Sequence, residues 1–506
     1  MAQKDWILTL NLHALGGISS QPNVSMPHGT PRSDYRTSEI TMESYSDAEE
    51  TAMPRRTLSV RPDLDEIVSV GLTNHRPLEI ARMELKLAGQ KLFESRRNFL
   101  PSVAARGSQS EGSTLISPND SSTRADFRRK ELGIELGQPI FQSGRIYYSQ
   151  KQAAAQEEAA SLAIAKVLQE ATFGILNSLY TFLQTREGVG LRKSVVKESQ
   201  DIMEATKKKR DIGVSSESEY LGVLSAGNQI EYKAVSEEKD FEIARSKLMG
   251  VLNLDSIPLE IPISLVDLAS RKVPATNLDL DNLIALALSN RPEIKTAYLG
   301  KKIKEYARKA ARGEYLLKVD ASGFVGQSGA AFAQENLNMK DSYNAGLRGT
   351  LYFGGSSISP QVSREKTAPD LGSNSRTETR AESVTVGLLD SLGARSNYFQ
   401  SKIEEEKAKE EFAAQKKGII IEVKEAFYNM QRARIQIDTA RKELEYRKKE
   451  AAIAKSKDRL HQIEATQFLQ AISGMTEAEV GIREATAYYL TALAALEKAT
   501  GQPLTR

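Results

Sequence analysis

The chain of 506 residues contains no cysteine, and this absence excludes disulfide bonds, thiolate metal sites and cysteine nucleophiles. Histidine is scarce as well: the four present, His13, His28, His75 and His461, are scattered, and none has a ligand partner at metal-binding spacing. Neither sign of charge is in clear excess, because 69 Lys and Arg face 66 Asp and Glu and leave a formal net charge of +3. This balance argues against nucleic acid as the main partner, since proteins that bind nucleic acid are usually strongly basic.

Motifs of catalysis are missing too. The chain has no Gly-x-Ser-x-Gly sequence and no glycine-rich phosphate loop, and Gly354-Gly355 lacks the Lys and the Ser or Thr that a nucleotide motif requires. Pairs of acidic residues are frequent, but their i,i+3 and i,i+4 spacing is typical of solvated helix surfaces. We therefore expect neither an enzyme nor a metal or cofactor site.

No segment of 18 or more consecutive apolar residues occurs, so a transmembrane helix is not expected. Transmembrane β-strands are not excluded in this way, because they alternate apolar and polar residues and give a weak signal per segment. The run from Trp6 to Gly17 is interrupted by Asn11 and His13, so a signal peptide is not evident. With the polar, Ser- and Pro-rich residues that follow, it makes up an expected disordered lead-in over residues 1–59.

What the chain does contain is an internal duplication. Residues 64–105 align with residues 280–321 at a constant shift of 216 without a gap, and ten of the 42 aligned positions are identical. Beyond residue 180 the two halves realign at a shift of 248, so the second half holds an insertion of 32 residues. This predicts a first repeat over residues 60–270 and a second over residues 271–506, with the insertion near residues 355–390.

Each repeat is expected to contain a pair of long helices. Residues 147–211 hold no proline and are rich in Ala, Leu, Glu, Lys and Gln, which predicts a helix roughly 90 to 100 Å long. After a turn at residues 212–215, apolar and small residues recur at spacings of three and four from Tyr220 to Val251, and again from Phe468 to Ala499. A sustained period of 3.5 indicates helices packed side by side as in a coiled coil.

Strands are predicted between the helical parts. Residues 131–140 alternate apolar and polar side chains, and residues 103–112 have the small and polar composition of a strand or loop. In the second half, residues 320–329, 345–353 and 383–390 are strand-like, while residues 355–382 have the composition of a polar insertion. The sequence leaves open which of residues 345–353 and 383–390 enters the sheet.

Several short motifs accompany this pattern, and although each is weak alone, their order and repetition are specific. An Asn and a Pro follow a short helix in each half, at Asn74 with Pro77 and at Asn290 with Pro292. A strand is entered at Phe99–Pro101 and left at Ile140–Arg145. A turn at Ile212–Val214 precedes a heptad helix that ends in the apolar sequence Leu248–Leu254. Over about residues 60–505 the chain thereby resembles the outer-membrane efflux protein family of TolC-like ducts.

The resemblance implies a mainly α fold with β-structure. Coiled-coil-like helix pairs would form a periplasmic α-barrel, and each chain would give four strands to one transmembrane β-barrel shared by a homotrimer. Physical reasoning agrees that several copies are needed, because two strands per half cannot close a barrel and an open edge in lipid leaves backbone groups unpaired.

The resemblance further implies a passive duct in the outer membrane of a Gram-negative cell. It would export small molecules or proteins as part of a tripartite efflux or type I secretion system. Its partners would be outer-membrane lipid, a periplasmic adaptor protein and an inner-membrane pump. The alternative is a soluble or peripheral coiled-coil scaffold without transport activity, which the lack of an evident signal peptide favours.

Candidate site residues follow from the same resemblance. The periplasmic mouth of such a duct is narrowed on the first turns of the return helices, and by position these residues are Glu219, Gln467 and Gln470. The family pattern has acidic residues at the two second-half positions, so here only Glu219 would bring charge to the aperture. Just before the first turn lies a basic run that is either a solvated face or a contact for an acidic adaptor surface: Lys207, Lys208, Lys209 and Arg210.

Overall fold

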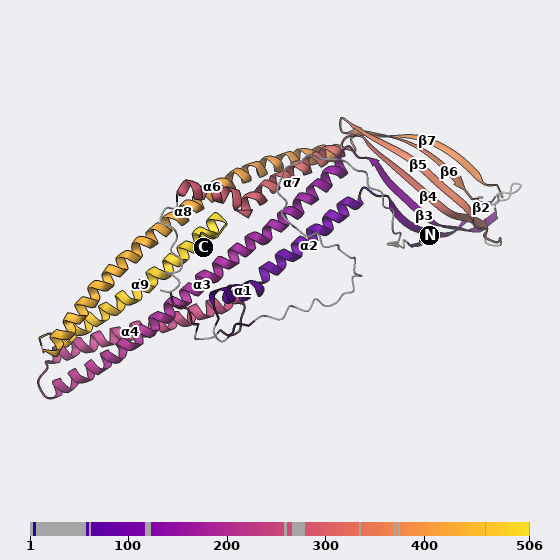
Figure 1. Ribbon diagram of the computed structural model, residues 1–506. Coiled ribbons are helices and arrows are strands. Elements are labelled where there is room, and N and C mark those ends of the chain that lie inside the picture. The colour runs from indigo at the N-terminus through magenta and orange to yellow at the C-terminus, as the bar shows by residue number, and fades with distance from the viewer. Residues whose placement is uncertain are drawn as a thin grey trace.

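The computed structural model describes residues 4–6, 57–59, 62–116, 123–257, 261–265, 279–332, 335–368, 371, 375–460 and 462–504. The molecule is elongated: long helices run side by side over most of its length, and a β-sheet continues from one end of them (Figure 1). The predicted fold class, mainly α with a separate strand-bearing part, is confirmed.

The two halves of the chain contain the same helices. The first half has α1 (Leu64–Thr73), α2 (Arg76–Arg97), α3 (Arg145–Asp211) and α4 (Glu217–Leu252). The second half has α6 (Leu280–Asn290), α7 (Pro292–Glu314), α8 (Leu392–Arg459) and α9 (Ala465–Thr500). α6 begins 216 residues after α1, and α9 begins and ends 248 residues after α4. The predicted boundary between repeats at residue 270 and most of the predicted lead-in lie outside the described residues.

Local sequence signals explain where these helices begin and end. Asp63 caps α1 by accepting a 2.7 Å hydrogen bond from the Glu66 N–H, and Ser216 caps α4 by accepting one of 3.1 Å from the Glu219 N–H. Gly213 has a φ of +75° and makes the left-handed step after α3. With 67 residues, α3 is about 100 Å long, in line with the predicted length.

The hydrophobic core lies between two antiparallel helix pairs, α3 with α4 and α8 with α9. Its central part is built from fully buried side chains of all four helices, among them Leu179, Phe182, Leu248, Val423 and Leu496. A smaller cluster near the helix turns joins the same four helices through Val195, Val223, Ala454, Phe468 and Leu469. Positions of the predicted heptad pattern therefore face the partner helices.

The sheet is antiparallel, and its strands are neighbours in chain order. They are β1 (Lys4–Trp6), β2 (Ser102–Ile116), β3 (Thr123–Phe141), β4 (Lys318–Phe332), β5 (Lys340–Phe353), β6 (Ser356–Thr367) and β7 (Thr377–Gly387). β3 pairs with β4 and thereby joins the sheet portions of the two halves. This pairing contains an irregularity between Pro139 and Phe141, where the missing N–H of proline interrupts the ladder.

The expectation of four strands per chain is wrong. The segment expected to be a polar insertion forms β6 and most of β7, so six long strands, β2 to β7, stand in one sheet. Both segments that the sequence left open belong to it: residues 345–353 lie in β5, and residues 383–387 end β7. Within the expected lead-in, Lys4–Trp6 forms β1 at the edge of β2. The physical reason is that β6 and β7 satisfy each other's backbone groups, which composition alone does not reveal.

Among the residues that the structure describes, one helix, α3, meets the length and hydropathy criteria for a membrane span, although the sequence contains no long uninterrupted apolar run. α3 contains an 18-residue stretch of mean hydropathy 1.3, although only 17% of that stretch is buried within the chain. A single stretch of this kind is weak evidence for a span. α3 packs along α4 through part of its surface. The apolar side chains of this stretch that are not buried are available to the surface of a neighbouring helix.

Candidate functional site

Both helix pairs turn at the end of the molecule farthest from the sheet (Figure 1). The first turns of α4 and α9 meet there at Gly222. A Cβ atom at Gly222 would lie only 3.1 Å from the Thr466 Oγ1, so the absence of a side chain lets the two helices approach. The predicted aperture residues all lie within the first two turns of these helices.

Glu219 is half-buried on the first turn of α4. Its carboxylate accepts a 2.8 Å hydrogen bond from the Ser215 hydroxyl, while its own N–H donates to the Ser216 Oγ. The N-terminus of a helix also favours a negative charge at this place. The turn therefore fixes the orientation of this carboxylate at the tip of the molecule.

Gln467 and Gln470 are exposed near the beginning of α9. Gln470 lines the groove described below, whereas Gln467 and Glu219 are outside its lining. The three side chains would form an aperture only in a ring of several copies of the chain, so their role in narrowing the mouth stays a prediction. Among the residues that the structure describes, no group of three or more His, Asp or Glu is arranged to hold a metal ion.

The basic run before the turn consists of cations in different surroundings. The guanidinium group of Arg210 pairs with Asp211 at 2.7 Å and lies 4.1 Å from the centre of the Tyr220 ring. The ammonium group of Lys208 pairs with Glu204 at 2.8 Å. Arg210 thus braces the turn between α3 and α4, while Lys207 and Lys209 are exposed on the surface.

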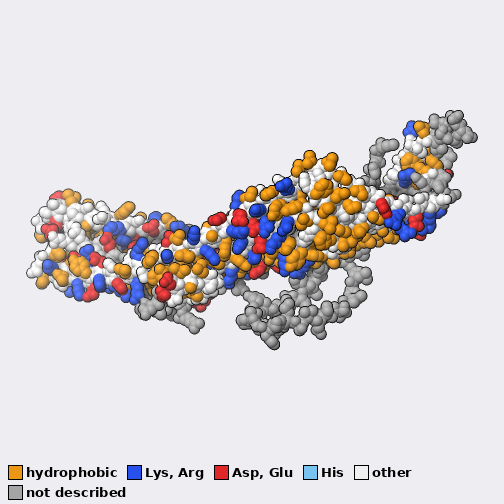
Figure 2. Space-filling model, turned by 90° about the horizontal axis from the view of Figure 1, so that it is seen from above, with side chains coloured by type: hydrophobic (Ala, Val, Ile, Leu, Met, Phe, Trp, Pro, Cys, Tyr) orange, Lys and Arg blue, Asp and Glu red, His pale blue; other side chains and the backbone are white. Residues whose placement is uncertain are grey.

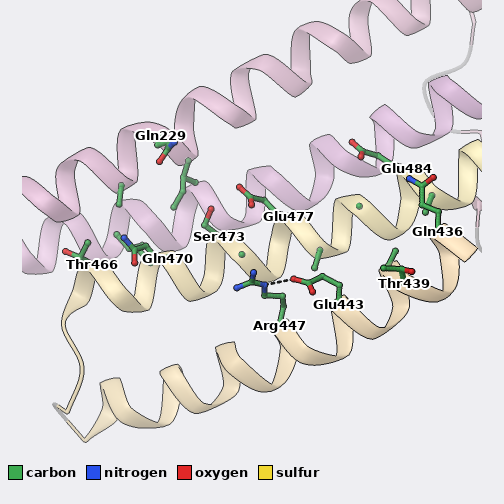
Figure 3. Close-up of a pocket in the computed structure, with 18 of the residues that line it drawn as sticks. Gln229, Gln436, Thr439, Glu443, Arg447, Thr466, Gln470, Ser473, Glu477 and Glu484 are labelled. Atoms are coloured by element: carbon green, nitrogen blue, oxygen red, sulfur yellow. Dashed lines mark hydrogen bonds and ion pairs between the residues drawn. The ribbon is translucent and has the colours of Figure 1, made fainter.

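An open groove of about 1160 Å³ lies between α4, α8 and α9 near this tip (Figure 3). Small residues of α4 and α9 leave the space for it: Gly222, Ser225, Ala226, Ser473, Gly474, Ala478 and Gly481. Polar and charged side chains surround it, including Gln229, Gln436, Thr439, Glu443, Arg447, Gln470 and Glu477 (Figure 3). Sequence reasoning found only Gln470 among them. The available signal was the recurrence of small residues along the segments of α4 and α9, which in the sequence indicates only helices packed side by side.

Ion pairs connect the two helix pairs beside the groove. Lys233 of α4 pairs with Glu477 of α9, and Arg483 of α9 pairs with Glu187 of α3 at 3.2 Å. Within α8, hydrogen bonds from Arg447 to Glu443 at 2.8 Å and to Glu450 at 2.9 Å raise the pKa of the Arg447 guanidinium. The arrangement contains charged contacts between helices and no combination of nucleophile, base and oxyanion donors.

The sheet has one apolar and one polar face. The apolar face bears exposed side chains from all six long strands, and the cross-strand registers place them on the same side: Val103, Leu132, Ile134, Leu136, Val325, Leu347, Leu351, Val362, Val384 and Val386. On β3 this face extends from Leu132, which is 65% exposed, to Phe141, which is 49% exposed. The segment from Leu132 to Phe141 contains ten residues, and a tilted strand needs about 9 to 11 residues to cross a bilayer.

Hydrophobic side chains gather on the surface where the sheet adjoins the helices, and Lys and Arg side chains border them on the helical side (Figure 2). The opposite face of the sheet is rich in Ser, Thr, Asn and Gln, for example Ser108, Ser322, Asn344, Gln361 and Thr385. An exposed apolar band opposite a polar face is the pattern of a transmembrane barrel wall.

Comparisons with known proteins agree with this geometry. Residues 68–253 match the family model described as Outer membrane efflux protein, whereas no curated protein matches the chain. Among solved structures, the outer-membrane channel OprN is similar, with 18% identity, a TM-score of 0.67, and coverage of 94% of this chain and 99% of that chain. The CmeC channel of Campylobacter jejuni is 14% identical, with a TM-score of 0.69 and coverage of 95% of this chain and 94% of that chain. The open state of the MtrE channel of Neisseria gonorrhoeae is 16% identical, with a TM-score of 0.65 and coverage of 92% of this chain and 98% of that chain.

The likeness to these structures extends over nearly the whole length of the chain and shows a common fold. The matching family model extends from α1 to the residue that caps α4, and the second half of the chain contains the corresponding helices α6 to α9, with α6 beginning 216 residues after α1 and α9 beginning 248 residues after α4. Residues 68–253 thus match the outer membrane efflux protein family, and the chain shares the fold of these solved outer-membrane channels over nearly its whole length.

Proposed function

We propose that three copies of this chain form a passive export duct, in which their sheets close into one β-barrel and their helix pairs form a periplasmic tunnel. In this proposal the chain is an outer-membrane efflux channel and not an enzyme, with its sheet in the outer membrane and its helices in the periplasm; the match of residues 68–253 to the efflux family and the fold shared with solved channels support it. The observation that supports several copies is the sheet itself. It has an apolar face of membrane-spanning height, yet β7 forms an open edge.

The tip of the helix pairs would be the entrance of the duct. Glu219, Gln467 and Gln470 of three copies would narrow it, and the exposed Lys207 and Lys209 would meet an acidic surface of a periplasmic adaptor. Cargo, either small molecules or proteins, would arrive from an inner-membrane pump through that adaptor. Entry would then require only that the helix pairs move apart, because no bond in the cargo is broken.

Extraction from membranes tests this proposal. We expect the protein to remain in the membrane fraction until detergent is added, to be extracted as a heat-resistant trimer, and to conduct ions in planar bilayers. Recovery of a soluble, elongated protein without detergent would contradict the duct and favour the coiled-coil scaffold instead.

A further inference from the structure

The inserted hairpin of β6 and β7 continues the sheet without a break in register. Backbone pairing of β6 with β5 extends from Ser356 opposite Phe353 to Lys366 opposite Tyr343. Pairing of β7 with β6 then covers eleven positions, from Ser357 opposite Gly387 to Thr367 opposite Thr377. A surface loop would not keep such a ladder over the full height of its neighbours.

The hairpin also reproduces the two faces of the other strands. Val362 lies opposite Leu347, and Ile358 lies between Leu351 and Val386, so the apolar face continues across β6 and onto the end of β7 that adjoins the helices, where Glu382 is the first charged residue on this face. The other face of the hairpin is lined by hydroxyl and amide side chains, namely Ser357, Ser359, Gln361, Ser363, Thr379, Ser383 and Thr385. This alternation is needed in a wall with lipid on one side and water on the other.

Charged residues end the apolar band at the same side of the hairpin as on β3. Toward the end of the sheet that is remote from the helices, Arg364 of β6 pairs with Glu378 of β7 at 2.6 Å, and the Tyr343 hydroxyl of β5 donates to the same carboxylate at 2.9 Å. On β3, Lys130 and Arg128 follow Leu132 on the apolar face in the same direction. The hairpin thus has an apolar band and a charged rim in the same order as β3.

From these observations we propose that β6 and β7 are part of the membrane wall and that β7 pairs with β2 of the next copy of this chain. The inference rests on the trimer of the proposed function and adds that the closed barrel has eighteen strands, six from each copy. Six is an even number, so β7 and β2 run in opposite directions and antiparallel pairing continues around the ring. β1 covers only Gly107, Ser108 and Gln109 on the β2 edge, and β7 of the neighbour replaces it there.

The additional strands widen the outlet. With strands about 4.8 Å apart and tilted by about 40°, an eighteen-stranded barrel is about 36 Å across between backbones, whereas twelve strands give about 24 Å. The added lining consists largely of uncharged hydroxyl and amide groups, so the larger outlet suits hydrated cargo of either charge. The helices are not enlarged in the same way, because the insertion lies entirely between β5 and α8.

Paired cysteines test the contact between copies, since the natural chain contains none. Val103→Cys on β2 is combined in turn with a cysteine at every second residue from Glu378 to Val386, which are the apolar-face positions of β7. The control series combines Val103→Cys with every second residue from Tyr343 to Leu351 on β5. Mild oxidation forms a disulfide only where Cα atoms approach within about 7 Å. Trimer formation without oxidant, measured by native mass, reports folding of each variant.

We expect covalent multimers with at least one β7 position and with none of the β5 positions. Links from β5 and none from β7 would overturn the eighteen-stranded barrel and leave the trimer intact, as would a trimer that neither series links. A monomer by native mass in the unaltered protein would instead contradict the proposed function itself.

A deletion supplies an independent test. The two ends of the insertion touch, because the Ser391 N–H donates a 3.0 Å hydrogen bond to the Gly355 carbonyl, so removal of residues 356–390 lets the chain rejoin with little rearrangement. Electron cryo-microscopy of the trimers should show eighteen strands for the unaltered chain and twelve for the deletion variant. Twelve strands in the unaltered protein, with the hairpin outside the wall, would refute the proposal.

Discussion

Glu219 is the one carboxylate among the three predicted aperture residues, so a trimer would bring three copies of it to the entrance. We expect Glu219→Gln to weaken the dependence of single-channel conductance on divalent cations, because the variant removes the only acidic group of the predicted ring. The matched control is Glu217→Gln, which removes an exposed carboxylate from the same helical turn. Planar bilayer recordings with and without magnesium measure the effect. Equal cation dependence of the Glu219 variant and the unaltered channel would exclude the aperture assignment.

Glu405 of α8 is a buried carboxylate that joins two helices. Burial alone would raise its pKa, but hydrogen bonds from Arg308 of α7 and from Lys409 outweigh this and leave the pKa below the ordinary value of 4.5. A group whose pKa is lowered by folding stabilises the fold above its unfolded pKa and loses this contribution as the pH falls through the folded pKa.

Glu405→Gln should therefore reduce stability by about 1 to 3 kcal/mol at neutral pH and by progressively less below about pH 4.5. Thermal unfolding followed by circular dichroism between pH 3 and 7 measures this difference. Glu404→Gln, which removes the neighbouring carboxylate whose side chain is 39% exposed, serves as the control and should have a smaller effect. A stability difference for Glu405→Gln that is independent of pH would show that the charge is not the cause.

Gly71 shows how closely α1 packs on the long helices. A Cβ atom at this position would lie 2.6 Å from the Ile175 Cδ1 and 2.7 Å from the Leu252 Cδ2, and both of these side chains are fully buried. Gly71→Val should lower the free energy of unfolding by about 1 to 3 kcal/mol, because overpacking forces neighbouring side chains out of place. The control is Gly250→Val on α4, where no atom would lie within 4 Å of the new Cβ. Equal thermal midpoints for the two variants would contradict this explanation.

At the scale of elements, the two antiparallel helix pairs share a hydrophobic core, and charged contacts between their described residues add to it near the tip. The pair between Lys233 and Glu477 links α4 with α9 near the tip, and both side chains are partly exposed. Such a pair contributes about 0.2 to 1 kcal/mol and weakens as salt screens it. It is therefore strong enough to bias the position of the helices and weak enough to be broken when the duct opens.

We expect Glu477→Gln to raise the open probability of the channel by up to about fivefold per copy at low salt, which corresponds to about 1 kcal/mol, and to have less effect at 1 M salt. Glu445→Gln, which breaks an exposed pair with Lys449 within α8, is the control that leaves the contact between helices intact. Bilayer recordings at two salt concentrations separate the variants. Identical gating of both would show that this ion pair does not restrain the helices.

The helices could be predicted from the sequence because their signals are local and occur twice. The heptad spacing, the turn at residues 212–215 and the shift of 248 residues between α4 and α9 are all visible without the structure. The location of Glu219 on the first turn of α4 follows from the same signals. The groove could not be found in this way, because Gln229, Arg447 and Ser473 come from three helices that only tertiary packing brings together.

The hairpin of β6 and β7 was missed for a different reason. Its polar face contains Ser, Thr and Gln, its outer rim contains Arg364 and Glu378, and Pro360 interrupts it, so its composition resembles that of a loop. Only the pairing partners reveal that its residues alternate between two environments. Strand signals depend on neighbours far away in the sequence, whereas helix signals do not, and this explains why the helices were predicted and the number of strands was not.

At the scale of the whole molecule, one chain exposes apolar surface in two places that a soluble monomer would not leave open. One is the band on the sheet, and the other is the weakly buried apolar stretch of α3. Lipid would cover the first and neighbouring helices the second. Membrane insertion would thus cover the apolar band on the sheet, and assembly would cover the apolar stretch of α3. A substitution on the apolar face of the sheet should therefore have a different effect from a substitution on its polar face.

Leu347 and Asn344 of β5 test this sidedness, because they lie three residues apart on opposite faces of one strand. Leu347→Arg puts a charge into the apolar band and should cost about 2 to 4 kcal/mol if it lies near the bilayer midplane, which would greatly reduce the yield of membrane-inserted trimer. Asn344→Arg adds the same side chain to the polar face, where the natural Arg348 already lies, and should leave the yield nearly unchanged. Trimer yields in outer-membrane fractions compare the two. Equal yields would mean that the exposed band does not face lipid, and a loss confined to Asn344→Arg would mean that the two faces are reversed.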